Sequence, residues 1–194
     1  MCSIDWHRKL DEAYVCGDCY EYALGFASPL DAWSMCERGD WLLWVAETFN
    51  VGKELIAKAS VKIARTVAHL AYDDVLILSL DLAEERLYND GSGDIPLRAV
   101  IEANRADKAD RPVTIHKLFA AHAIDSATRA CLANTDRIAY RHAPYVVSYA
   151  AKALALSTGD GNVIPSVELA SLASSARIIR DVIPFELVAK GVWW

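Results

Sequence analysis

Long hydrophobic runs are absent from this 194-residue sequence, and no apolar stretch approaches the roughly 20 residues that a membrane-spanning helix needs. The beginning of the chain carries charges at short intervals and lacks the uninterrupted apolar core of a secretory signal. We therefore expect a cytoplasmic protein that does not bind a membrane.

Recognisable catalytic and metal-binding motifs are also missing. The five cysteines are an odd number at irregular spacing, which is typical of free thiols in a reducing compartment. Cys16 and Cys19 form one Cys-x-x-Cys pair, but no second pair or closely spaced histidines complete a four-ligand zinc site. Neither a Gly-x-Ser-x-Gly elbow nor a phosphate-binding glycine loop occurs. We predict no enzymatic activity, no catalytic residue, no cofactor and no metal.

Strand patterns are scarce, whereas helical periodicity recurs along the chain. Apolar residues return every three or four positions in residues 53–71, 115–127 and 169–183. These apolar positions are Ile56, Ala59, Ile63, Val67 and Leu70, then Ile115, Leu118, Phe119, Ala123 and Ala127, then Leu169, Leu172, Ala176, Ile179 and Ile183. We predict an all-α fold: a single compact multi-helix domain over residues 1–194, built from antiparallel helix pairs. As an alternative, this domain would be divided into an N-terminal lobe over residues 1–94 and a C-terminal lobe over residues 95–194.

Charge is distributed unevenly between the two halves. Residues 1–94 contain 17 acidic and 8 basic residues, whereas residues 95–194 contain 9 acidic and 12 basic ones. The densest acidic segment contains Asp73, Asp74, Asp81, Glu84, Glu85, Asp90 and Asp94. Such a segment is either a solvated helix face or a surface that attracts a basic protein, and it repels nucleic acid. These seven residues are our candidate partner-binding surface.

Three tryptophans, a cysteine and a charged corner lie within residues 31–49. Ser28 before Pro29 predicts the start of a helix, and Gly39 is placed to end it in the left-handed conformation. Asp40 is then placed to cap a second helix that carries Trp41 and further apolar residues.

Three segments of the sequence resemble a family of immunity proteins associated with bacterial toxin-immunity systems and also found in phage-related genes. Residues 32–45, AWSMCERGDWLLWV, are similar to the family signature Ala-Trp-x-x-Cys-x-Arg-Gly-Asp-Trp-Met-Leu-Trp, with Leu42 in place of Met. Residues 96–108, PLRAVIEANRADK, resemble a second family segment but lack its Trp. Residues 176–188, ARIIRDVIPFELV, resemble the closing motif, with Phe185 in place of Trp.

This resemblance implies an all-helical fold and brings no catalytic residues with it. We interpret its motif residues as mainly architectural: Trp33, Cys36, Glu37, Arg38, Gly39, Asp40, Trp41, Trp44, Arg98, Glu102, Pro184 and Glu186. The tryptophans and Cys36 would fill the junction between two helices. The charged residues Glu37, Arg38 and Asp40 would tie the corner to Arg98 and Glu102, or to Glu186.

The function that the resemblance implies is a non-enzymatic inhibitor that binds and neutralises a toxin or a defence-system component inside the bacterial cell. A phage-encoded, anti-CRISPR-like inhibitor of a bacterial nucleic-acid-targeting complex would use the same acidic surface. A small-ligand-binding or enzymatic domain built around Cys36, Arg38 and Asp40 is a third hypothesis, because Arg38 would suit an anion. The sequence leaves the oligomeric state open.

Overall fold

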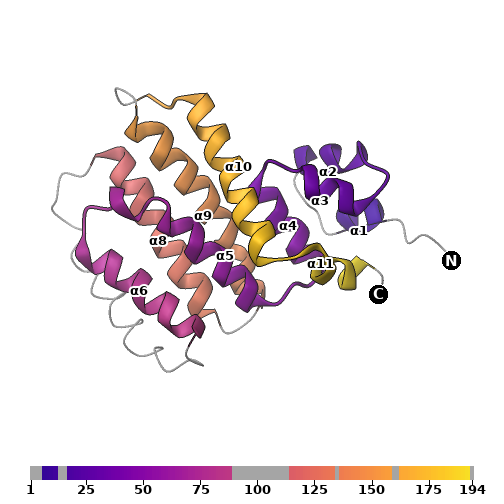
Figure 1. Cartoon of the computed structure of the whole chain (residues 1–194), viewed down its shortest axis with the longest axis horizontal. Helices are drawn as coiled ribbons and strands as arrows, with labels where there is room; N and C mark the ends of the chain where they lie inside the picture. Colours follow the sequence, from indigo (N-terminus) through magenta and orange to yellow (C-terminus); the bar gives the residue numbers. More distant parts are fainter. Residues whose placement is uncertain (1–5, 13–16, 89–113, 134–135, 159–161, 193–194) are drawn as a thin grey trace.

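The computed structural model describes residues 6–12, 17–88, 114–133, 136–158 and 162–192 (Figure 1). Within these ranges the regular elements are all helical, which confirms the predicted all-α fold. Their order is α1 (Trp6–Glu12), α2 (Gly17–Leu24), α3 (Pro29–Met35), α4 (Gly39–Thr48), α5 (Lys53–Arg65), the 3-10 turn η1 (Ala68–Leu70), α6 (Asp74–Tyr88), α8 (Ile115–Leu132), α9 (Asp136–Ser157), α10 (Pro165–Val182) and α11 (Phe185–Val192).

The long helices α8 and α9 form the centre of the fold. They pack along each other, and α5 packs on both of them, lying in front of the pair in the view of Figure 1. Alanines such as Ala123 and Ala127 on α8 and Ala143 and Ala150 on α9 are fully buried. Because the separation of two packed helices depends on the side chains between them, these small residues allow close approach. The alanine-rich middle of the sequence is therefore the core of the structure.

The helical periodicity identified the core face of α5 correctly but those of α8 and α10 only in part, since Leu169 on α10 is 62% exposed. On α5, Ile56, Ala59 and Ile63 are fully buried, although the α-helix ends at Arg65 and not at residue 71. On α8, Ile115 and Leu118 are 53% and 41% exposed, so the prediction that they face the core was wrong. The alanine side of α8 faces its neighbours because α5, α6 and α9 all pack against this helix, and larger side chains would hold them apart.

Different helices form the two ends of the molecule. The short helices α1, α2 and α3 lie with α11 at one end of the long axis, and α6 lies toward the other end (Figure 1). One cluster of buried residues nevertheless extends from Trp6 to Val188. The proposed boundary between two lobes at residues 94 and 95 falls outside the described residues. Among the described helices, none has both the length and the hydrophobicity to cross a membrane.

Candidate functional site

The first candidate site is the corner between α3 and α4, where the sequence motif of residues 32–45 lies. The start of α3 is as predicted: the Ser28 hydroxyl accepts hydrogen bonds from the backbone N–H groups of Leu30 (3.2 Å) and Asp31 (3.4 Å), and Pro29 occupies the first helical position. Helix α3 ends at Met35, and Cys36 is its C-cap.

Gly39 does not end α3, and this prediction was wrong. Gly39 is the first residue of α4, and its φ lies outside the left-handed region. The physical reason for glycine here is the close approach of α10, because a Cβ on residue 39 would lie 2.8 Å from the Cβ of Ser175. Two carbon atoms normally stay about 3.5–4.0 Å apart. Gly39 thus permits a helix contact that any other residue would obstruct.

Asp40 does not cap α4 in the predicted way, because its carboxylate is engaged by a neighbouring side chain. The Arg38 guanidinium donates two hydrogen bonds to Asp40, from Nε to Oδ1 at 2.9 Å and from an Nη to Oδ2 at 2.6 Å. The same guanidinium lies 4.6 Å from the centre of the Trp41 ring, a cation-π distance. Arg38 is the N-cap residue of α4, and its side chain makes no capping hydrogen bond to that helix. Arg38 is thus held by residues of its own corner, and an external anion would compete with Asp40.

The residue that ties the corner to the rest of the fold is Arg180 of α10, which the sequence interpretation missed. Its Nη1 donates to the carbonyl oxygens of Cys36 (2.6 Å) and Trp33 (3.3 Å) at the end of α3. A cation at a helix C-terminus also interacts favourably with the helix dipole. Arg180 lies in residues 176–188, the third segment of the resemblance, which is the signal that could have identified it.

The interior of the corner is packed and has no room for an organic ligand. Trp33, Cys36 and Trp41 surround a cavity of about 20 Å³ together with Trp6, Tyr22 and Phe185. A volume of that size holds at most one water molecule. Trp33 and Cys36 are 3% and 1% exposed, so both are core residues. Trp44 is half-buried and is not part of this lining.

Cys36 has the environment of a structural thiol. Burial, with a smaller contribution from the Asp40 carboxylate, raises its pKa to about 11. The thiol donates a hydrogen bond to the Arg38 carbonyl oxygen at 3.4 Å, so it is protonated and engaged near neutral pH. Because the thiolate is the nucleophile, these features weaken the hypothesis of an enzyme built around Cys36, Arg38 and Asp40.

The remaining motif residues lie apart from these contacts. Glu37 is exposed. Pro184 separates α10 from α11, and its carbonyl accepts from the Leu187 N–H at 3.0 Å. Glu186 is exposed in the first turn of α11, and no ion pair joins it to the corner within the described structure. Arg98 and Glu102 lie outside the described residues.

The second candidate site is helix α6, which carries four of the seven acidic candidates, with a fifth, Asp73, directly before it. Asp73 precedes the helix, and its carboxylate accepts from the Val75 N–H at 2.8 Å, so this residue caps α6. The other two candidates, Asp90 and Asp94, lie outside the described residues.

An exposed row runs along α6, which we call the α6 stripe. It consists of Asp74, Leu78, Asp81, Glu85 and Tyr88, which recur every three or four positions and therefore share one side of the helix. Leu78 is 48% exposed and Tyr88 is 67% exposed, so two large apolar side chains lie among three carboxylates in this row.

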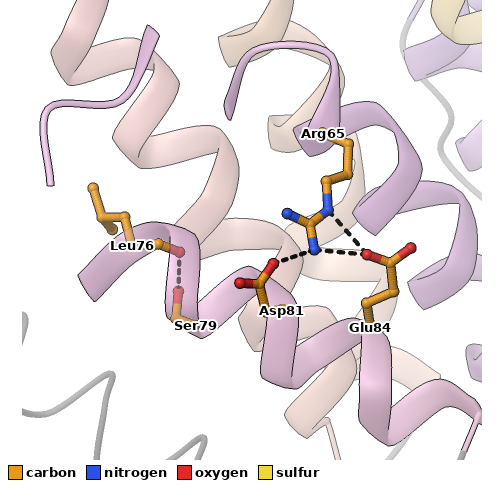
Figure 2. A network of polar contacts seen from close by, with 5 residues as sticks. All are labelled: Arg65, Leu76, Ser79, Asp81 and Glu84. Atoms are coloured by element: carbon orange, nitrogen blue, oxygen red, sulfur yellow. Dashed lines mark hydrogen bonds and ion pairs between the residues drawn. The ribbon is translucent and has the colours of Figure 1, made fainter. Parts of the chain in front are cut away.

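Part of the negative charge on α6 is offset by Arg65 of α5. Figure 2 shows the guanidinium between two carboxylates of α6, with one Nη 2.5 Å from Asp81 and 2.7 Å from Glu84. Despite partial burial, which favours the neutral form, these two hydrogen-bonded carboxylates raise the pKa of Arg65. Earlier in α6, the Ser79 hydroxyl donates a hydrogen bond to the Leu76 carbonyl oxygen at 2.7 Å (Figure 2). Arg65 thus fixes α6 on α5 while leaving a net acidic surface.

Two depressions elsewhere on the surface carry no recognisable catalytic arrangement. One, of about 310 Å³, is lined by Lys53, Glu54, Lys58, Arg86 and Cys131 with apolar neighbours. Burial raises the pKa of Cys131 to about 12, which keeps its thiol protonated. The other, of about 620 Å³, is lined by Lys9, Phe49, Leu55, Leu187 and Lys190, among others. In the described part of the chain, no three His, Cys, Asp or Glu side chains come together as a metal site would require.

The fold, the corner between α3 and α4 and the α6 stripe define the class of this molecule. It is an all-α protein whose tryptophan-rich motif is part of the core and whose α6 presents a mixed acidic and apolar surface. Comparison with models of protein families, with curated proteins and with solved structures gave no significant match.

Proposed function

We propose that this chain is a non-enzymatic protein inhibitor of the immunity type, which binds and neutralises another protein through the α6 stripe. The observation that carries the proposal is the composition of that stripe, where exposed Leu78 and Tyr88 lie among carboxylates. Exposed apolar side chains bordered by charges are typical of surfaces that bind proteins.

The charge on the stripe indicates a basic partner. Four carboxylates on α6 (Asp74, Asp81, Glu84 and Glu85) lie in the same region as three cations. These are Arg65, Arg86 and Lys58, whose ammonium is 5.8 Å from the centre of the Tyr88 ring, so the region keeps a small net negative charge. Complementary charge accelerates encounter and rejects like-charged partners, while Leu78 and Tyr88 supply apolar contact. A toxin or defence-system component that handles nucleic acid has a basic groove, and such a groove suits this surface.

A charge-reversal experiment tests the proposal. Tagged wild-type chain is used to capture proteins from cells of its native host and from phage-infected cells, and the captured proteins are identified by mass spectrometry. We expect a basic protein that is released as salt is raised, because screening weakens charge attraction. The variant Asp74→Lys/Glu85→Lys should lose it. The variant Asp11→Lys/Glu21→Lys, which changes the same charge on exposed residues of α1 and α2, should retain it.

Inhibition is then measured directly with the captured protein. Its activity, or its toxicity when expressed in cells, should fall in the presence of the wild-type chain and not in the presence of Asp74→Lys/Glu85→Lys. Equal capture and equal inhibition by both variants would refute the α6 stripe as the contact surface. Capture without any effect on the partner's activity would refute the inhibitor function.

A further inference from the structure

A second exposed surface lies on α8 and α9, and three of its α8 residues, Ile115, Leu118 and Phe119, are positions that the sequence periodicity assigned to the core. We call it the aromatic face, and it consists of Ile115, Leu118, Phe119 and His122 on α8 and Tyr145, Tyr149 and Lys152 on α9. Ile115, Leu118 and Tyr145 are 53%, 41% and 54% exposed, so three large apolar side chains lie on this surface.

Ring contacts join the two helices of the aromatic face into one continuous surface. Tyr149 lies at its centre, with ring centres 5.9 Å from Phe119, 5.3 Å from His122 and 6.0 Å from Tyr145, which stacks on it. Aromatic pairs at these distances hold each other in place. The surface is therefore preorganised, which lowers the entropic cost of binding a partner.

The aromatic face is bordered by positive charge. On α9, Arg141 lies one turn before Tyr145, and Lys152 lies two turns after it. The Lys152 ammonium is 5.7 Å from the centre of the Phe119 ring. On α8, Arg129 is paired with Asp125, so that pair adds no net charge. The face thus combines aromatic side chains with an excess of cations.

The chain itself presents the complementary surface. The α6 stripe also combines exposed apolar side chains, Leu78 and Tyr88, with charged ones, but its charged members are carboxylates. We propose that copies of this chain associate head to tail, with the α6 stripe of one copy on the aromatic face of the next. In this arrangement Leu78 and Tyr88 contact the aromatic face, and the carboxylates of the stripe approach Arg141 and Lys152. This inference needs no other protein, and because it uses the same α6 stripe as the proposed inhibitor function, self-association and partner binding would compete for that surface.

Sedimentation velocity on the pure chain tests the proposal over a protein concentration from about 10 µM to about 500 µM, a range suited to micromolar-to-millimolar dissociation constants. At about 50 mM salt we expect the weight-average mass to rise from 21.4 kDa toward about twice that value or more with concentration. At about 500 mM salt the rise should be smaller, because the charges are screened.

Two single variants distinguish a head-to-tail contact from a symmetric one. Leu78→Glu removes the apolar centre of the α6 stripe, and Tyr145→Glu places a carboxylate in the aromatic face. Each variant alone should stay at 21.4 kDa. Mixed in equal amounts, they should form a complex of about twice that mass that grows no further, since each variant retains one intact surface. The control Leu24→Glu, on an equally exposed residue of α2, should associate like the wild type.

The outcomes that overturn the proposal are defined by the same measurements. A wild-type mass of 21.4 kDa at every concentration would exclude self-association, whatever else binds the aromatic face. A mixture of the two variants that remains monomeric would exclude the head-to-tail contact. Circular dichroism checks that both variants are folded, and Lys152→Glu, a smaller change on the same face, should also weaken association. A failed capture experiment with host proteins would leave these results unaffected.

Discussion

Replacing Gly39 by alanine tests whether the contact between α4 and α10 is as close as the structure indicates. Helix propensity alone favours the change by no more than about 1 kcal/mol, the difference between alanine and glycine in a helix interior, because Gly39 is the first residue of α4. Packing opposes it, because the new methyl group would lie 2.8 Å from the Ser175 Cβ and 3.1 Å from both the Ala176 nitrogen and the Ser175 carbonyl carbon. Two of these three atoms are backbone, so a rotamer change cannot relieve the clash.

The two effects have opposite signs, and their sizes decide the outcome. Overpacking of this kind costs about 1–3 kcal/mol, which exceeds the gain in propensity. We expect Gly39→Ala to lower the free energy of unfolding by about 1 kcal/mol. For a chain of this size, that corresponds to a fall of about 2–4 °C in the melting temperature. Urea denaturation followed by circular dichroism measures the free energy, and a scan of temperature measures the midpoint.

A matched control exists at the start of another helix. Gly17 is the first residue of α2, as Gly39 is of α4, but a Cβ there would meet no atom within 4 Å. Gly17→Ala should therefore stabilise the protein by about 0.4–1 kcal/mol through the unfolded state alone. If Gly39→Ala also raised the stability, the close approach of α10 would be refuted. If Ser175→Gly rescued part of the loss in the Gly39→Ala background, the contact would be assigned to that residue pair.

Three further predictions concern the contacts that hold the two candidate sites. Arg180→Met should lower the free energy of unfolding by about 2–4 kcal/mol in urea melts, because two carbonyls at the end of α3 lose a charged donor; a loss below about 0.5 kcal/mol would contradict this role. Burial raises the pKa of Cys36 to about 11, so above about pH 9 the folded state keeps a thiol proton that the unfolded chain releases. The contribution of Cys36 to the free energy of unfolding is therefore intact below about pH 9 and declines from about pH 9 to about pH 11. The free energy of unfolding of Cys36→Ala should decline less than that of the wild type over that pH window. Equal declines in the two proteins would exclude Cys36 as a cause. Arg65→Met should cost less than about 1 kcal/mol of stability, because the ion pairs of Arg65 are partly exposed. The same variant should bind a basic partner faster, because Asp81 and Glu84 lose their cation. Slower association in stopped-flow measurements would contradict the proposed use of α6.

The local rules of helix formation were readable in the sequence. Ser28 and Pro29 start α3 where the capping pattern predicts, because both preferences depend only on neighbouring backbone groups. The α5 positions that the periodicity assigned to the core, Ile56, Ala59 and Ile63, are buried, because residues three and four positions apart share one side of a helix. The acidic run of residues 73–94 likewise placed several carboxylates on the outside of α6.

Tertiary structure decided the features that depend on which helices meet. The role of Gly39 comes from α10, which is more than a hundred residues away in the sequence, and so does the tie that Arg180 makes to α3. The sequence pattern of residues 115–127 predicted one core face for α8 that combined Ile115, Leu118 and Phe119 with Ala123 and Ala127. Close packing against three neighbouring helices selected the alanines and left Ile115 and Leu118 outside, because the free energy of packing depends on partners that a single helix pattern does not contain.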